Sequence, residues 1–184
     1  HMTLTGPNLH GAVFGVNCDG LTLAHLRIVD FQWSGVRTFF MNDARVHDNT
    51  FVDAGGKHKH NGGALFLTWC TDSEFWNNRI SKTPDHHSNF YGFKGRGGKR
   101  LRFHHNTVEV GFSLEYPFEH DQFIEIDHNA FTGPISIPKH AGGAVPEGGY
   151  TFHIHHNWLQ SSYALEWHRN GTEVDHNLFD FDTE

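Results

Sequence analysis

The stretch LRFHHNTVEV (residues 101–110) contains a pattern that returns along the chain: apolar, polar, polar, Asn, any residue, apolar. The same pattern occurs in ARVHDNTF (44–51), SEFWNNRI (73–80), FIEIDHNAF (123–131), FHIHHNWL (152–159) and TEVDHNLF (172–179). The recurring residues are Asn49, Asn78, Asn106, Asn129, Asn157 and Asn177, and Leu26 fills the equivalent position in an imperfect first copy. Repeats of about 20 to 30 residues indicate stacked structural units.

Each copy has the pattern of a short strand rather than a helix. Apolar and polar residues alternate with period two, the segments are rich in Phe, Ile, Val and Thr, and 20 Gly residues lie along the chain. The pattern resembles that of right-handed parallel β-helix proteins, in which each coil carries three short strands and stacks on the next. We therefore expect an all-β solenoid of about 6–7 coils with an Asn ladder.

This pattern predicts two apolar columns inside the solenoid. The first consists of Val46, Phe75, Phe103, Ile126, Ile154 and Val174, and the second of Phe51, Ile80, Val108, Phe131, Leu159 and Phe179. The Asn between them is expected at a tight bend with a left-handed backbone conformation. Its amide can bond the equivalent Asn about 4.8 Å away in the next coil, so we expect a structural role.

Two outward positions in the same segments carry polar residues. One position nearly alternates in charge: Arg45, Glu74, Arg102, Glu125, His153 and Glu173. Such residues are neighbours on parallel strands, which predicts a cross-strand charge ladder. The next position contains His104, Asp127, His155 and Asp175, which could together ligate a divalent metal. The alternative is a solvated, hydrogen-bonded face, and we expect no metal to be required.

Length and charge limit the function classes. At 184 residues the chain fits one domain, and residues 1–2 resemble an expression scar. The repeat pattern opens and closes in the middle of a unit, so residues 3–184 are expected to form a piece of a longer solenoid. The net charge of −7 argues against a nucleic-acid partner. No apolar run is long enough for a membrane span. We expect exposed solenoid ends that permit self-association.

A second strand follows each Asn-bearing one, and its repetition is less regular. If Leu67, Phe93, Leu114, Ile137 and Leu165 share the inward position, one outward column contains Thr68, Lys94, Glu115, Pro138 and Glu166. The next outward column then contains Cys70, Arg96, Pro117, His140 and His168. This face gathers carboxylates, cations and aromatic rings, and functional residues on a repeat scaffold are expected where repetition fails.

The Glu pair on this face suggests glycoside hydrolysis. Glu115 and Glu166 would lie two coils apart, with backbones separated by about 9.5 Å. Inverting glycosidases hold their carboxyl groups about 6.5–9.5 Å apart. Lys94 would keep Glu115 ionised as the base, and Glu166 beside Trp167 would be the acid. The structural alternative is a surface salt-bridge cluster.

Substrate contacts are expected around this pair, from the strands and from the loops that would wall a groove. The candidates for binding a sugar are Arg96, Tyr116, Glu119, His120, Lys139, His140, Trp167 and His168. Their aromatic rings would stack on sugars, and their cations would neutralise a uronate carboxylate. The expected partner is therefore a polysaccharide or an oligosaccharide.

The Asn-bearing coils also resemble the pectate-lyase-like superfamily of polysaccharide lyases, glycoside hydrolases and C5 epimerases. The resemblance implies a secreted, periplasmic or cell-surface bacterial protein. In the similar alginate lyases a strand Lys is the base and an Arg one coil later is the acid, often with calcium. Lys94 matches that Lys, but the Arg position falls on Glu115 and Tyr116. Lyase chemistry would then need Tyr116, His140 or His168 as proton donor.

Three functions remain open from the sequence. The first is a glycoside hydrolase that uses Glu115 and Glu166 and requires no cofactor. The second is a lyase or epimerase for uronate polymers, with Lys94 as base, with Arg96, Lys139 or a metal neutralising the carboxylate, and with calcium as a possible cofactor. The third is a non-catalytic β-helix module for carbohydrate binding or adhesion.

Overall fold

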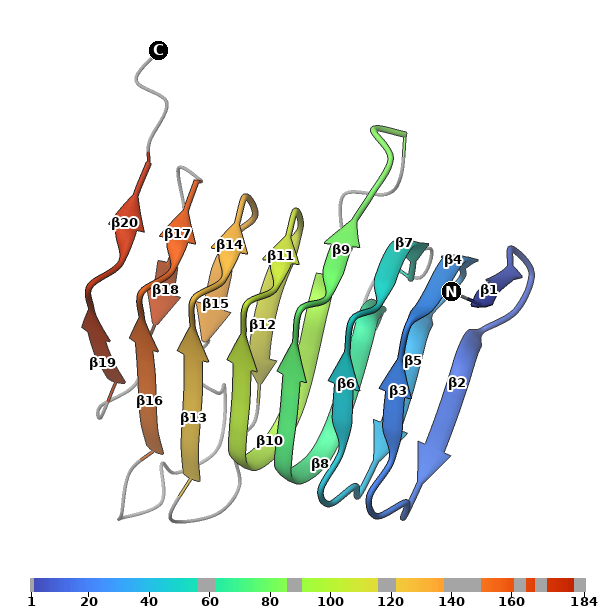
Figure 1. Ribbon diagram of the computed structural model, residues 1–184, viewed down its shortest axis with the longest axis horizontal. Helices are drawn as coiled ribbons and strands as arrows, with labels where there is room; N and C mark the ends of the chain where they lie inside the picture. The colour runs from blue at the N-terminus through green and yellow to red at the C-terminus, as the bar shows by residue number, and fades with distance from the viewer. Residues whose placement is uncertain are drawn as a thin grey trace.

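The computed structural model describes residues 2–55, 62–85, 91–115, 122–137, 150–160, 165–167 and 172–180. These residues form an all-β structure of parallel strands, a β-solenoid of about six turns (Figure 1). The chain advances along the long axis from β1 at one end to β20 at the other. Within the described ranges, no helix is long and apolar enough to cross a membrane.

One side of the solenoid is an eight-stranded parallel sheet. Its strands are β1 (Met2–Gly6), β4 (Leu26–Phe31), β7 (Thr50–Ala54), β9 (Arg79–Ser81), β11 (Thr107–Val108), β14 (Ala130–Phe131), β17 (Trp158–Leu159) and β20 (Leu178–Phe179). Most of these strands are short because the chain turns sharply on both sides of them. The sheet packs its apolar side chains against the inside of the other two walls.

A 12-stranded sheet forms those two walls, which are continuous through the long strands β8 (Gly63–Trp76) and β10 (Tyr91–His104). We call the first the histidine wall: β3 (Thr22–Ala24), β6 (Arg45–His47), the ends of β8 and β10, β13 (Gln122–Asp127), β16 (Tyr150–His155) and β19 (Thr172–Asp175). We call the second the cationic wall: β2 (Gly11–Val16), β5 (Ser34–Phe39), the starts of β8 and β10, β12 (Gly111–Glu115), β15 (Ile135–Ile137) and β18 (Leu165–Trp167). Figure 1 shows β8 and β10 bending from one wall into the other.

Both predicted apolar columns are confirmed by the strand register. Phe103, for example, pairs with Phe75 on one side and with Ile126 on the other, and all three are buried. In the second column Val108 pairs with Ile80 and Phe131. The rings of Phe75 and Phe103 stack with centroids 4.7 Å apart. Continuous columns of this kind bury the apolar surface that a single coil cannot bury alone.

The repeated Asn side chains form hydrogen bonds from coil to coil. Asn78 Nδ2 donates to Asn106 Oδ1 at 3.0 Å, and Asn106 Nδ2 donates to Asn129 Oδ1 at 3.0 Å. Leu26 does occupy the equivalent position, because its backbone N–H donates to Asn49 Oδ1 at 2.9 Å. Buried amides with this many partners stabilise the turn without exposing unsatisfied polar groups.

The predicted left-handed conformation of these Asn residues was wrong. The positive φ belongs to the residue before each Asn, for example Asn77 (50°), His105 (55°) and His156 (55°). The backbone N–H of Asn78 also donates to Asn106 Oδ1, at 3.0 Å, so both donors of that Asn point along the stack. The bend is therefore made one residue earlier, where the side chain points to solvent.

Candidate functional site

The predicted inward alignment on the cationic wall was wrong by two residues. Phe93 pairs with Leu65 and Phe112, whereas Leu67 pairs with Gly95. Gly95 faces the interior, where an added Cβ would lie 2.4 Å from a methyl carbon of Leu114. A glycine gives no apolar signal in the sequence, so the inward position could not be recognised within FKGRGG.

This register separates the two glutamates of the predicted hydrolase pair. Glu166 pairs with Ser136, which pairs with Ser113, whereas Glu115 pairs with Arg96. The two glutamates are therefore two strands apart across the sheet and two residues apart along it. From strand spacing and rise, their backbones are separated by about 12 Å. The single outward column that was predicted to contain both does not form.

Three cations instead gather on the outer face of the cationic wall: Arg37, Lys94 and Arg96. The guanidinium carbon of Arg37 lies 4.8 Å from the ring centroid of Phe66, and that of Arg96 lies 5.7 Å from the same centroid. Lys94 Nζ lies 4.8 Å from the ring of Tyr91. Cation–π contacts of this length hold the charges against aromatic rings, and Phe66 and Lys94 are themselves buried.

The environment of Arg37 favours an anion nearby. Burial, and secondarily the positive charge of Arg96, lower the pKa of Arg37 from its ordinary value. In the described part of the chain, Arg37 Nε is buried without a hydrogen-bond partner. A buried donor without an acceptor is costly, and a carboxylate bound at the accessible part of the guanidinium would offset the repulsion from Arg96.

A cavity of about 450 Å³ adjoins Arg37 at the β2 end of this wall. It is lined by Leu9, His10, Gly11, Val13, Phe14, Trp33 and Arg37. The side chain of Phe14 is 68% exposed, and the rings of His10 and Trp33 lie 4.8 Å apart. Exposed rings beside a cation provide both the stacking and the charged contact that an acidic sugar uses.

Sequence reasoning missed Arg37 because that first coil lacks the repeated Asn. The available signal was the alternation in SGVRTF (34–39), which places Val36 inside and Arg37 outside. Several predicted site residues lie outside the described residues: Tyr116, Glu119, His120, Lys139, His140 and His168. For Glu115, Glu166 and Trp167 only the strand positions are described. The catalytic and binding roles of these residues stay predictions.

On the histidine wall, the four predicted metal ligands do not converge on one point, because Asp127 and His104 are held by other residues. Arg102 donates from Nε and Nη2 to the two oxygens of Asp127, at 3.0 and 2.9 Å. His128 Nδ1 lies 2.8 Å from Asp127 Oδ2. Burial alone would raise the pKa of Asp127, but these hydrogen bonds outweigh it and lower that pKa. His104 is likewise engaged, with Nε2 2.8 Å from Glu74 Oε1.

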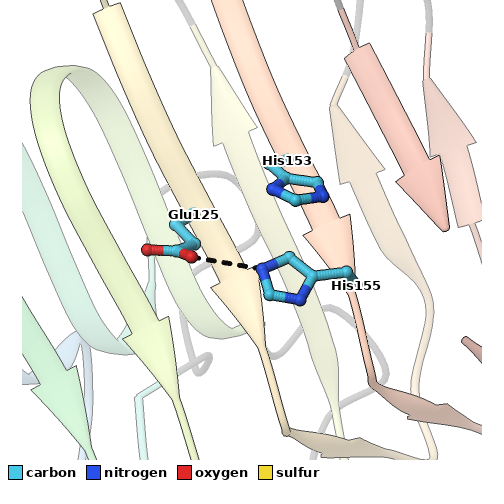
Figure 2. Close-up of side chains that lie close together, drawn as sticks. All are labelled: Glu125, His153 and His155. Carbon is cyan, nitrogen blue, oxygen red and sulfur yellow. Dashed lines mark hydrogen bonds and ion pairs between the residues drawn. The ribbon is translucent and has the colours of Figure 1, made fainter. Parts of the chain in front are cut away.

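A different group of three side chains converges on the same wall. Glu125 of β13 and His153 and His155 of β16 each offer one ligand atom, and these atoms lie within 4.8 Å of one another. Figure 2 shows Glu125 and His155 pointing toward each other across neighbouring strands, with His153 beside them. The predicted residues His155 and Asp175 also converge, together with His156, in a second such group.

The chain has no match among protein-family models, curated proteins or solved structures. Its β-solenoid fold is therefore established by the strand pairing alone. Its chemistry has to be inferred from the side chains on the two walls. The cationic wall offers sites for anionic groups, and the histidine wall offers nitrogen and oxygen ligands.

Proposed function

We propose that this chain is a carbohydrate-active β-solenoid whose cationic wall binds a uronate polymer. The observation that carries the proposal is the arrangement of Arg37 and Arg96 on one Phe66 ring, with Arg37 Nε lacking an acceptor. A planar guanidinium binds a carboxylate through two parallel hydrogen bonds, which is more specific than contact with a point charge. Uronates present one carboxylate on every sugar.

The surroundings of this cluster support a sugar rather than a small inorganic anion. Phe14, Trp33 and His10 line the adjoining cavity, and aromatic faces bind the apolar faces of sugar rings. The chain as a whole carries a net charge of −7, so recognition of an acidic polymer depends on this local group of cations. The resemblance of the coils to the pectate-lyase-like superfamily agrees with a carbohydrate ligand.

A second candidate is cleavage of the bound uronate by β-elimination, with Lys94 as the base. Lys94 is favoured because it follows Arg37 and Phe66 in one outward column, on the strand that also carries Arg96. In this reaction the Lys94 amine would take the C5 proton, and the C5–H electrons would form the C4–C5 double bond. The C4–O bond would break, and its oxygen would take a proton from an acid, for which Tyr116, His140 and His168 are the sequence-based candidates.

Binding can be tested by calorimetry with uronate oligosaccharides and with neutral oligosaccharides of equal length. Arg37→Gln should weaken uronate binding about tenfold or more, because a charge-assisted hydrogen bond is lost. The matched control is Arg79→Gln on the eight-stranded sheet, where Arg79 Nη2 pairs with Glu109 at 2.8 Å. Equal binding of neutral and uronate sugars, or equal losses in both variants, would contradict the proposal.

The reaction can be tested through its products. Elimination gives an unsaturated sugar that absorbs in the ultraviolet, whereas hydrolysis gives only new reducing ends. Loss of the ultraviolet signal in Lys94→Ala with activity retained in Glu166→Gln would support elimination. Reducing ends that disappear in Glu166→Gln would instead favour the hydrolase hypothesis. Binding without either product would identify the chain as a carbohydrate-binding module.

A further inference from the structure

The histidine wall contains the same four-residue arrangement twice. The first quartet is Glu74, Arg102, His104 and Asp127, from β8, β10 and β13. The second quartet is Glu125, His153, His155 and Asp175, from β13, β16 and β19. In each quartet a glutamate, a pair of outward residues and an aspartate occupy equivalent positions on three successive strands. The main difference between the quartets is that the second quartet contains His153 at the position that Arg102 occupies in the first.

The contacts within the two quartets correspond closely. His104 Nε2 lies 2.8 Å from Glu74 Oε1, and His155 Nε2 lies 3.1 Å from Glu125 Oε1. Arg102 pairs with Asp127 in the first quartet, and in the second His153 Nε2 lies 3.0 Å from Asp175 Oδ2. The first quartet therefore contains a cation that is permanently charged and offers no lone pair to a metal. The second has an imidazole there, which is a metal ligand when neutral.

The geometry points to a divalent transition-metal ion, of the zinc class, held by Glu125, His153 and His155. Their ligand atoms lie within 4.8 Å of one another. Ligands about 2.0–2.1 Å from a tetrahedral zinc ion are about 3.3 Å apart. The 3.1 Å separation of Glu125 Oε1 and His155 Nε2 already fits that edge, and the ring of His153 has its centroid 4.0 Å from that of His155.

Neighbouring groups orient two of the three ligands. Arg102 Nε lies 3.3 Å from Glu125 Oε2, which leaves Oε1 for the ion. His155 Nδ1 lies 2.8 Å from His156 Nδ1, which fixes the ring so that Nε2 faces Glu125. Such outer contacts are typical of metal-binding histidines and carboxylates. Asp175 adjoins the site through His153 and is available as a further oxygen ligand.

The donor set decides the kind of ion. Two imidazole nitrogens and one carboxylate suit zinc and related first-row ions, whereas calcium and magnesium require oxygen ligands. The site lies on the histidine wall, so it is independent of the anion-binding role proposed for the cationic wall. A variant that loses zinc binding should therefore still bind uronate, and a variant that loses uronate binding should still bind zinc.

Isothermal titration of the full chain with zinc chloride, and in parallel with calcium chloride, tests this site. We expect one zinc ion per chain to bind more tightly than any further zinc ion. We expect the calcium titration to show no comparable tight site. Visible absorption after addition of cobalt(II) should show tetrahedral coordination. Absence of a distinct tight zinc site in the wild type would overturn the proposal.

The decisive variant is His153→Arg, which recreates the first quartet and should therefore fold, as circular dichroism can verify. It should weaken zinc binding at least about tenfold, as should Glu125→Gln. The matched control is His105→Asn, which removes an imidazole from the same wall at a position where Asn77 stands in the preceding coil. Unchanged binding in His153→Arg, or an equal loss in His105→Asn, would show that zinc binds elsewhere among the 18 histidines.

Discussion

The Arg102 quartet and the His153 quartet occupy equivalent strand positions and lie two coils apart. They differ in how deeply the aspartate is buried and in which side chains pair with it. In the first, Asp127 is completely buried and is paired with a guanidinium through two hydrogen bonds. In the second, Asp175 is 44% exposed and is paired with imidazoles. The solenoid places both quartets at equivalent strand positions, so the residue at position 102 or 153 decides whether the positive charge is permanent or exchangeable.

This difference in burial indicates that one quartet stabilises the fold and that the other is free to bind a ligand. A buried carboxylate needs its partner at all times, because an unpaired buried charge is strongly destabilising. A partly exposed carboxylate can lose its partner at little cost, since water replaces it. We therefore assign the Arg102 quartet to the stability of the fold and propose the His153 quartet for ligand binding.

The largest expected effect is on the free energy of unfolding. Arg102→Ala should lower it by up to about 3 kcal/mol, because buried Asp127 loses its guanidinium partner and retains only His128. His153→Ala should lower it much less in metal-free buffer, because Asp175 is exposed to solvent. Urea unfolding of the two variants measures this difference, and Arg102→Lys should recover part of the loss. Equal losses for both alanine variants would remove the distinction between the quartets.

A second experiment would convert one quartet into the other. Arg102→His should create a zinc site from Glu74 and His104 together with the new imidazole, because those two side chains already lie 2.8 Å apart. Calorimetric stoichiometry should rise from one zinc ion to two per chain. A variant that folds normally and still binds a single ion would show that the quartets are not equivalent.

The smallest expected effect is on the pH dependence of stability and concerns His105, whose Nδ1 lies within hydrogen-bond distance of His104 Nδ1 in the first quartet. Burial, and then the nearby rings of His104 and His128, lower the pKa of His105 below 6.5. The folded state thus binds fewer protons there than the unfolded state, so stability should fall as pH decreases below about 6.5 and through the lowered pKa. His105→Asn should make that decline shallower.

Urea midpoints at neutral and mildly acidic pH, compared with those of the wild type, measure this effect. Asn is suitable at position 105 because Asn77 adopts the same left-handed backbone conformation in the preceding coil. A variant with an unchanged or steeper loss of stability in acid would show that other groups dominate the pH dependence.

The sequence was sufficient to predict the fold and the register of the histidine wall. Bulky residues such as Phe103 and Ile126 mark the inward positions, and the adjacent Asn fixes their place in each coil. The cationic wall has no such marker. In FKGRGG (93–98), Gly95 occupies the inward position that pairs with Leu67, so the alignment moved to the nearest apolar residue, Phe93, two positions away.

The candidate sites depended on contacts that no repeat pattern specifies. Grouping His104 with Asp127 assumed that residues at one position in successive coils bind together. In the structure Asp127 is instead held diagonally by Arg102, and His104 by Glu74. Such diagonal contacts depend on which pair of side chains meets across two strands, and His153 makes the equivalent contact with Asp175.

The amide hydrogen bonds that join Asn78, Asn106 and Asn129 affect how the number of coils in this solenoid can change. Each Asn-bearing coil presents the same amide donor and acceptor to its neighbours, so one full repeat that was duplicated or removed would leave these hydrogen bonds in place. Removal of a few residues inside a strand would instead break the pairing of that coil, whereas the loops tolerate changes in length, because successive Asn positions are 20 to 29 residues apart. Addition of a whole repeat therefore extends the binding surface of such a solenoid without loss of the hydrogen bonds between coils.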